Sequence, residues 1–385
     1  MAKIIYHHRT LGDGAEGIHI LEMINAFRSL GHTVDIAGPT GEPAVSNKKN
    51  TLGKWFKNQL PQISFELLEI GYSFYCFINL CFMIRKIKPD FIYDRYITFN
   101  VGVIWAGRLC GVPVVLEVNA PLAFERSTEP DEKLFFKKWA FSLERYICSQ
   151  ADLTIVVSTP LKDYLESVGV PSGKCFVMPN GVNQYNFSPK PKDDSLKKIL
   201  GITKDATIIG FAGILRPWHG LELIIDAVAR LKTSGRLVYL LVVGDGPIRL
   251  QIEKMLNELN LSNEFCITGR IRHDMMADYV NLFDIAVSPK ATFYASPMKI
   301  VEYMALGKAV VVPDLQNFRD MIDDGKNGIL FSDEKGKTLV EILELLCDSV
   351  HLRQQLGNNA RKKVESRLNW EWNAREVCKH FNIRS

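Results

Sequence analysis

Short apolar runs alternate with helical hydrophobic patterns along most of this 385-residue chain. Residues 2–8 form the first run, and a helical pattern with Ile20, Ile24 and Phe27 on one side follows it. Further runs lie at residues 33–37, 90–93, 113–118 and 153–157. Because parallel strands have to be joined by crossover segments, which are usually helices, this alternation predicts βαβ units and a parallel sheet.

The series of strands and helices restarts near the middle of the chain. A short strand pattern at residues 175–181 ends in a Pro-Asn-Gly turn, and a charged, proline-bearing stretch follows at residues 188–198. A new strand pattern begins at residues 207–212. The expected fold is therefore α/β, with two Rossmann-like, doubly wound parallel-sheet domains. We place the first domain at residues 1–185, the second at 186–368, and a C-terminal helix that packs back on the first domain at 369–385.

The composition argues against several classes of protein. The net charge of +4 shows no clustered imbalance of the kind expected in a nucleic-acid-binding protein. The eight cysteines include no Cys-x-x-Cys pair, so no metal site is expected. Reduced core thiols indicate a cytoplasmic protein. The N-terminal run is too short and too polar for a signal peptide.

An uncharged apolar segment, residues 70–84, is the stretch that most resembles a membrane span. As a helix of about 15 residues it would reach roughly 22 Å, which is short of a hydrocarbon core of about 30 Å. Glu66 and Glu69 precede the segment. The basic residues that follow it are Arg85, Lys86 and Lys88. We therefore expect a buried or half-buried helix, with contact to a bilayer surface or a true span as the alternatives.

Residues 296–313 carry the most informative local pattern. Ser296 is a good helix N-cap and Pro297 suits the first helical position. The start of this helix, including Met298, offers free N–H groups and a positive dipole end, which suit a diphosphate. Lys299 lies in the first turn, where a cation is unfavourable unless an anion binds, and Glu302 can accept hydrogen bonds from two ribose hydroxyls. An amphipathic helix with Lys and Glu on its surface is the alternative.

The run from Glu302 to Val311, Glu-Tyr-Met-Ala-Leu-Gly-Lys-Ala-Val-Val, resembles the second half of the nucleotide-sugar signature of glycosyltransferase family four. That family contains retaining enzymes with the GT-B fold, in which two Rossmann-like domains face a cleft. The resemblance places the family's ribose-binding glutamate at Glu302 and its sugar-binding glutamate at Tyr294. Residues 296–299 resemble a branch with a Ser-Pro-x-Lys motif, which makes Lys299 a phosphate ligand. Because Tyr294 replaces the family's sugar-binding glutamate, the resemblance does not identify the donor sugar.

Other segments of the second half agree with this resemblance. Residues 211–220, which include Gly213, resemble the family's Gly-rich turn that holds an Arg and a Lys for the diphosphate. The match puts Ile214 and His219 at those two positions, and Arg216 is near enough in sequence to serve the same phosphates. The alternative is a turn whose arginine points to water. Weaker resemblances are the post-strand turn at Gly244, the nucleobase loop with Arg270 and Ile271, and the interdomain linker at residues 179–182 with Phe187.

The first half is less specific. A Gly-rich turn at residues 12–17 suggests that Gly14 and Gly17 let the backbone approach the donor phosphates. Glu117 and Asn119 lie at and just beyond the end of a strand, and the family often has a donor-binding histidine at about Asn119. The sequence therefore predicts sugar or acceptor contacts there, to which Glu125 and Arg126 also contribute. A cluster of caps and salt bridges is the alternative.

The resemblance implies a retaining hexosyltransferase that uses a UDP- or GDP-linked sugar as donor, with no other cofactor. The first domain would bind a glycan or lipid-linked acceptor, in surface polysaccharide or glycolipid assembly, and the second the donor. Attack would occur on the front face of the sugar, without a metal ion. The catalytic candidates are Arg216, Lys299, Glu117 and Asn119. The alternatives are a GT-B sugar-nucleotide epimerase and a nucleotide-sugar-binding pseudoenzyme.

Clusters of basic and aromatic residues suggest peripheral contact with the anionic inner face of the cell membrane. One cluster lies in the helix expected at residues 131–149: Lys133, Phe135, Phe136, Lys137, Lys138 and Trp139. Another precedes the apolar segment: Lys48, Lys49, Lys54 and Lys57. Solvated amphipathic helices are the alternative.

Overall fold

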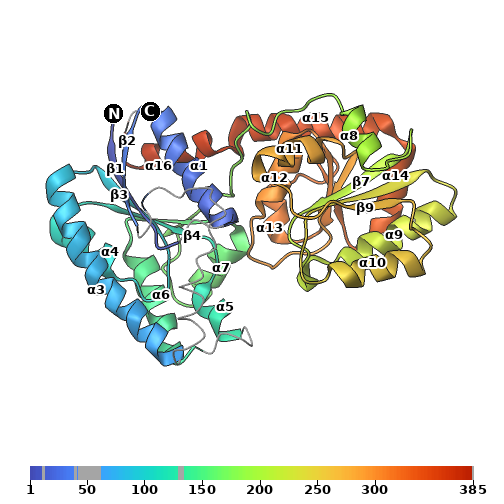
Figure 1. The fold of residues 1–385 in the computed structure, drawn as a ribbon. Coiled ribbons are helices and arrows are strands. Elements are labelled where there is room, and N and C mark those ends of the chain that lie inside the picture. Colours follow the sequence, from blue (N-terminus) through green and yellow to red (C-terminus); the bar gives the residue numbers. More distant parts are fainter. Residues whose placement is uncertain (11–13, 39–40, 42–61, 129–133, 384–385) are drawn as a thin grey trace. The chain divides into compact units, whose positions relative to one another are not determined.

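A computed structural model describes residues 1–10, 14–38, 41, 62–128 and 134–383 (Figure 1). The chain divides into two compact units, Met1–Pro179 with Trp370–Ser385 and Asn180–Asn369, and each is described by itself. Part of the Gly-rich turn, Gly12 and Asp13, lies outside the described residues, as do the basic residues predicted to lie near a membrane at Lys48, Lys49, Lys54, Lys57 and Lys133.

The N-terminal unit contains a six-stranded sheet in the order β2-β1-β3-β4-β5-β6, and all of its strand pairs are parallel. Its strands are β1 (Lys3–His7), β2 (Thr33–Ala37), β3 (Phe91–Arg95), β4 (Val114–Val118), β5 (Leu153–Val156) and β6 (Cys175–Val177). The central strands β3, β4 and β5 are almost wholly buried, as strands covered on both faces should be.

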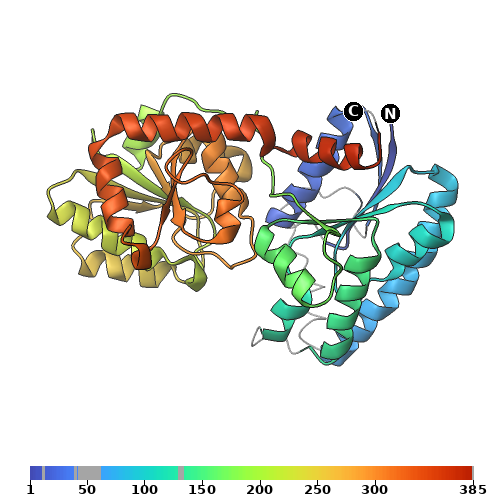
Figure 2. The same ribbon diagram turned by 180° about the vertical axis from the view of Figure 1, so that it is seen from behind.

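Helices cover both faces of this sheet (Figures 1 and 2). They are α1 (Ala15–Ser29), α3 (Gln62–Ile87), α4 (Gly102–Cys110), α5 (Leu122–Thr128), α6 (Lys137–Gln150), α7 (Thr159–Ser167) and α16 (Trp370–His380). The C-terminal helix α16 packs against α1, with the rings of Trp370 and His19 4.6 Å apart. Just beyond α16, the ring of Phe381 stacks on Phe91 of β3 at 5.4 Å. Residues 370–381 thus contribute to the core of the first unit.

The second unit contains another six-stranded parallel sheet, in the order β12-β11-β10-β7-β8-β9. Its strands are β7 (Thr207–Ala212), β8 (Val238–Val243), β9 (Phe265–Ile267), β10 (Ile285–Val287), β11 (Ala309–Pro313) and β12 (Ile329–Phe331). Its α-helices are α8 (Asp194–Ile199), α9 (Leu221–Thr233), α10 (Arg249–Glu258), α11 (His273–Asn281), α12 (Met298–Ala305), α13 (Gln316–Arg319), α14 (Leu339–Asp348) and α15 (Val350–Arg367).

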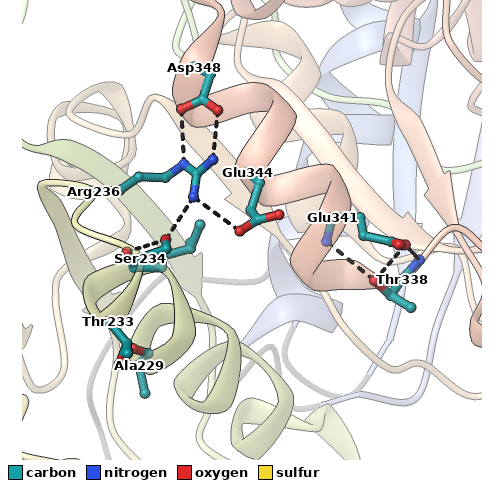
Figure 3. A network of polar contacts seen from close by, with 9 residues as sticks. Ala229, Thr233, Ser234, Arg236, Thr338, Glu341, Glu344 and Asp348 are labelled. Atoms are coloured by element: carbon teal, nitrogen blue, oxygen red, sulfur yellow. Dashed lines mark hydrogen bonds and ion pairs between the residues drawn. The ribbon is translucent and has the colours of Figure 1, made fainter.

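Two apolar cores lie on the two faces of the second sheet. One joins buried side chains of α11, α12 and α15 to the sheet, and the other joins those of α9, α10 and α14. Arg236, between α9 and β8, fixes α14 from outside by donating two hydrogen bonds to Asp348, at 2.7 and 2.9 Å, and one to Glu344 at 3.0 Å (Figure 3). Thr338 and Glu341 form a capping box at the start of the same helix. Helix α14 therefore has specific polar contacts at both of its ends.

The length predicted for the apolar helix was wrong. Helix α3 has 26 residues rather than about 15, because it extends in both directions past the uncharged segment. At 1.5 Å per residue it measures about 39 Å. Among the described residues, Ile63–Ile87 forms a helix long and apolar enough to cross a membrane by length and composition, although a soluble core helix passes the same test.

A close helix crossing in the second unit makes a testable prediction. A Cβ added to Gly357 of α15 would lie 1.9 Å from the carbonyl oxygen of Gly307, which follows α12. We expect Gly357→Ala to lower the free energy of unfolding by about 1–3 kcal/mol, because the two backbones must separate. The control is Gly71→Ala in α3, where no atom lies within 4 Å of the added Cβ. That change should instead stabilise its helix by about 0.5–1 kcal/mol. Equal midpoints of thermal unfolding for the two variants would contradict the predicted crossing.

Candidate functional site

The loops that follow β7 and β8 pack backbone to backbone at the carboxyl edge of the second sheet. The N–H of Gly213 donates to the carbonyl of Val243 at 2.9 Å, and that of Leu215 donates to Asp245 at 3.0 Å. A Cβ on Gly244 would lie 2.0 Å from the carbonyl oxygen of Gly213, and Gly244 also has a φ of 143°. Glycine is therefore needed at position 244 for this contact, whatever else the loop binds.

The loop after β9 joins the same edge. The hydroxyl of Thr268 accepts a hydrogen bond from the N–H of Gly244 at 3.2 Å, and Gly244 also forms an isolated bridge with Gly269. Arg270, which follows, is exposed, and Ile271 is half-buried. The structure thus brings the two predicted nucleobase-loop residues next to the Gly244 turn.

Helix α12 is attached to this edge by a buried tyrosine that the sequence analysis missed. The N–H of Ala212, the last residue of β7, donates to the hydroxyl of Tyr303 at 2.6 Å, and the tyrosine is fully buried. An amphipathic pattern marks Tyr303 only as a core residue. Its hydroxyl sets the distance between α12 and β7, because a buried hydroxyl requires a partner.

The prediction that Ser296 caps α12 was wrong. The helix begins at Met298, its N-cap is Pro297, and no side chain caps it. Ser296 is instead hydrogen-bonded to Asn180. The backbone N–H of Asn180 donates to the serine hydroxyl at 3.0 Å, and its side-chain amide donates to the serine carbonyl at 2.7 Å. This contact joins residues 116 positions apart, so no local pattern could reveal it.

Lys299, in the first turn of α12, lies beside the Gly213 loop. Its ammonium is 4.2 Å from the centre of the Phe211 ring, and a Cβ on Gly213 would lie 3.9 Å from it. Among the described residues it has no hydrogen-bond or ion-pair partner. Burial lowers its pKa to about 7, although Glu302 opposes the shift. Lys299 is thus a half-buried amine whose charged form has no hydrogen-bonded counter-ion in the described part of the chain.

Glu302, one turn further along α12, is half-buried, and its carboxylate has no hydrogen-bond partner within the described part of the chain. Burial raises its pKa to about 7, and Lys299 opposes this shift. The charged forms of both side chains are therefore destabilised. Perturbed groups of this kind, next to each other on one helix, are typical of binding or catalytic sites.

His219 and Arg216 belong to the loop that connects β7 to α9. Nδ1 of His219 donates to the carbonyl of Ile214 at 2.6 Å, which leaves Nε2 as an acceptor in the neutral ring. Burial, Lys299 and Arg216 lower the pKa of His219 to about 4. Neutral His219 cannot donate from Nε2 to a phosphate, so the predicted phosphate contact requires its protonation. Arg216 is exposed and stacks on the Trp218 ring at 5.2 Å.

The position of the family's first glutamate is occupied by a buried side chain. Tyr294 packs edge-on against Phe293, with ring centres 5.0 Å apart. The side-chain amide of Asn317, which the sequence analysis missed, holds this loop by donating to Thr292 at 3.2 Å and Ala295 at 2.7 Å. Asn317 therefore fixes this loop through backbone carbonyls that are more than 20 residues away in sequence, so a local sequence pattern does not indicate its role.

In the N-terminal unit, Glu117 is buried at 2% exposure and surrounded by donors. It accepts from the hydroxyl of Tyr93 at 2.6 Å, from His19 at 2.8 Å and from Arg95 at 3.2 Å, and also from the amide of half-exposed Asn119. Burial alone would raise the pKa of Glu117, but these partners hold it below its usual range. The salt-bridge cluster considered as the alternative describes these surroundings, and it joins α1, β3 and β4.

The other residues predicted in this unit lie on α1 and α5. Gly14 is the N-cap of α1 with a φ of 78°, and Gly17 is buried in the same helix. Arg126 of α5 pairs with Glu69 of α3 at 2.9 Å. No group of three or more metal-ligating side chains occurs among the described residues of either unit.

Comparison with known proteins identifies the family. Residues 16–184 match the model of Glycosyltransferase Family 4, and residues 192–363 match that of Glycosyl transferases group 1. The chain belongs to these glycosyltransferases. Solved structures share this fold. One of them is HepE from Anabaena in complex with UDP, which matches with a TM-score of 0.72 and 16% identity over 99% of this chain and 100% of that one. The predicted pair of Rossmann-like, parallel-sheet domains of the GT-B fold is thereby confirmed.

Curated relatives of this glycosyltransferase act on different molecules. An alpha-D-kanosaminyltransferase of Streptomyces kanamyceticus is 25% identical over 66% of this chain and 66% of its own length, so the match spans slightly less than two thirds of that protein. An Escherichia coli enzyme, named UDP-Gal:alpha-D-GlcNAc-diphosphoundecaprenol alpha-1,3-galactosyltransferase, is 24% identical over 76% of this chain and 75% of its own length.

The shifted pKa of Lys299 can be measured directly. We expect the rate of its acylation by an amine-selective reagent to rise with a midpoint near pH 7, because burial disfavours the ammonium. Glu302→Gln should move the midpoint to lower pH, since it removes the carboxylate that favours the charged amine. Peptide mass spectrometry gives the rates, with exposed Lys254 as the internal control. A midpoint for Lys299 near that of an ordinary lysine, about pH 10, would contradict the buried environment.

The Glu117 cluster predicts a loss of stability when its charge is removed. Glu117→Gln leaves Arg95 without its buried counter-charge and places an amide NH2 where a carboxylate oxygen accepts hydrogen bonds, so we expect a loss of about 3–5 kcal/mol. Urea unfolding followed by hydrogen exchange of β3 and β4 measures it. Asp163→Asn, at an exposed position of α7, is the control. A loss below about 1 kcal/mol, which is usual for a surface pair, would show that the cluster is not structural.

Proposed function

We propose that this glycosyltransferase binds a UDP- or GDP-linked sugar at the carboxyl edge of its second sheet and transfers the sugar with retained anomeric configuration. The observation that carries the proposal is the pair on α12. Lys299 and Glu302 are half-buried, lie one turn apart and have no hydrogen-bond partners among the described residues. A nucleoside diphosphate supplies what both lack, since it offers phosphate oxygens to one and ribose hydroxyls to the other.

The chemistry of the pair suits such a donor. A diphosphate beside Lys299 would raise its pKa above 7 and keep it charged, and hydroxyl donors to Glu302 would lower the pKa of that carboxyl. The first turn of α12, the helix that carries both side chains, also provides the positive end of a helix dipole. Exposed Arg216 adds a guanidinium–phosphate contact to that of Lys299 once it leaves the Trp218 ring.

The proposed reaction depends on positioning and charge. The acceptor hydroxyl attacks the anomeric carbon from the face that the diphosphate leaves, and the departing phosphate oxygen takes the hydroxyl proton. Lys299, Arg216 and the start of α12 neutralise the charge that develops on the leaving group, which is the largest contribution such a site can make. The proposal assigns this neutralisation to the protein, so donor binding should persist in a chelator.

For the acceptor we propose a glycan or lipid-linked sugar, used in surface polysaccharide or glycolipid assembly at the inner face of the cell membrane. Support comes from the Escherichia coli relative, whose name states a diphosphoundecaprenol-linked acceptor. The enzyme would contact the membrane from its cytoplasmic side as a peripheral protein.

A pseudoenzyme that binds nucleotide sugars without transferring them is the second candidate. Buried Tyr294, at the position of the family's sugar-binding glutamate, favours it because a carboxylate contact to the sugar is missing there. Slow release of free sugar from a bound donor would exclude this candidate. An altered sugar still linked to its nucleotide would instead indicate an epimerase.

Donor binding tests the main proposal. In a thermal-shift screen of UDP- and GDP-linked sugars, repeated in a chelator, at least one donor should raise the unfolding midpoint. Lys299→Ala should weaken UDP or GDP about 10- to 150-fold, because one charge-assisted hydrogen bond is lost. Lys299→Arg should recover part of the affinity, and Lys254→Ala on α10 should leave it unchanged. Unchanged affinity in Lys299→Ala would overturn the assignment of the phosphate site.

A further inference from the structure

The outward side of α3 carries large apolar side chains in helical register. Each of these side chains is between 54% and 64% exposed: Leu67, Leu68, Phe74, Tyr75, Ile78 and Phe82. Neighbouring α4 adds Trp105, 38% exposed, and Leu109, 67% exposed. Helices α3 and α4 lie side by side (Figure 1). The Trp105 ring packs edge-on against Phe74 and Phe77, so these exposed side chains form one continuous surface, which we call the α3–α4 face. A soluble surface helix normally shows the opposite polarity.

The acidic residues of α3 point inward. Glu66 is fully buried and accepts from the N–H groups of Phe135 and Phe136 at 2.7 and 2.8 Å. Glu69 pairs with Arg9 at 2.5 Å and with Arg126 at 2.9 Å. No formal charge therefore lies on the outward side of α3 from Leu67 to Ile84. In water it is unfavourable to bury carboxylates and to expose large apolar side chains on the same helix. The exposed apolar side chains are no longer unfavourable if lipid covers the outer side of the helix.

Basic residues border the α3–α4 face at both ends. At the C-terminal end of α3, Arg85, Lys86 and Lys88 are exposed. Near the other end of α3, Glu66 accepts hydrogen bonds from the residues that precede α6. At the start of α6, Lys137 and Lys138 are exposed, and so are the neighbouring Phe135 (61% exposed) and Trp139 (60% exposed). An uncharged apolar surface between two cationic borders complements an anionic bilayer, in which acyl chains lie beneath charged headgroups.

We infer that the α3–α4 face docks on an anionic lipid bilayer, with α3 lying in the plane of the interface. A transmembrane orientation conflicts with the inner side of the helix. There, Ser73, Cys76, Leu80 and Ile84 are buried, and the N–H of Gly102 in α4 donates to the hydroxyl of Ser73 at 3.0 Å. A Cβ on Gly102 would lie 2.1 Å from the Ser73 carbonyl, so α3 is locked to the folded unit.

This inference rests on the proposed function for its acceptor, because the docked helix also borders the carboxyl edge of the N-terminal sheet. The Tyr72 hydroxyl and Cys76 sulfur of α3 contact His7, the last residue of β1, at 3.1 and 3.3 Å. Glu69 holds Arg9 and Arg126, which follow β1 and β4. An acceptor anchored in the same bilayer would therefore meet the edge at which parallel sheets bind their ligands.

Flotation of the full chain with vesicles tests the inference. The wild type should float with phosphatidylcholine–phosphatidylglycerol vesicles and less with phosphatidylcholine alone. The triple variant Phe74→Ser, Ile78→Ser, Phe82→Ser should lose at least about tenfold in partitioning to both, because three apolar side chains no longer enter the bilayer. Arg85→Glu with Lys86→Glu should weaken only the anionic case. Ile199→Ser with Leu250→Ser, at exposed apolar positions of the second unit, is the control and should float like the wild type.

Three outcomes would overturn the inference: no flotation of the wild type at low salt, equal flotation of the triple variant, or a wild-type dimer that the triple variant makes monomeric without any lipid binding. Circular dichroism confirms folding, and Ile78→Asn alone replaces the triple variant if that one does not fold. The UDP or GDP thermal shift, read on the same samples, separates the two proposals. A retained shift without flotation removes only the docking face, whereas flotation without a shift removes only the donor site.

Discussion

The hydrogen bond from the N–H of Ala212 to the hydroxyl of Tyr303 is the contact on which the candidate site depends. It joins the last residue of β7 to α12 at 2.6 Å, inside a fully apolar core. Lys299 and Glu302 lie on the same helix, within one turn of the tyrosine, so this contact also sets their height above the sheet. The Gly213–Gly244 backbone contact fixes the loop that lies beside Lys299. A rigid frame of this kind holds groups whose charged forms are individually destabilised.

The two units use buried charge in opposite ways. Glu117 is stabilised by several donors and joins three elements, whereas the side chains of Lys299 and Glu302 have perturbed pKa values and no hydrogen-bond partners among the residues that the structure describes. The first arrangement contributes stability, and the second reserves hydrogen-bonding capacity for a ligand. His219 lies between the two cases, since its neutral ring is fixed by Ile214 but keeps one free nitrogen.

Local patterns predicted the elements well, and they predicted side-chain partners poorly. β7 and β8 occupy the residues that their hydrophobic runs indicate, 207–212 and 238–243, because a fully buried parallel strand is an uninterrupted apolar run. The length of α3 was underestimated because Glu66 and Glu69 were taken as its boundary, although both turn inward to partners distant in sequence. The prediction that Ser296 caps α12 was wrong for the same reason, because the hydrogen-bond partner of Ser296 is Asn180, which is distant in sequence. The assignments of Lys299 and Glu302 came from a family resemblance, and spacing alone left them open.

The path of the chain has a consequence for synthesis. The polypeptide leaves its first unit at Pro179 and returns to it only at Trp370, where α16 covers His19 and the chain end reaches Phe91. During translation the second unit is therefore fully emerged before the first can close its core. The parts of α1 and β3 that Trp370 and Phe381 cover therefore stay exposed until this segment has left the ribosome, which happens only after the whole second unit has been made.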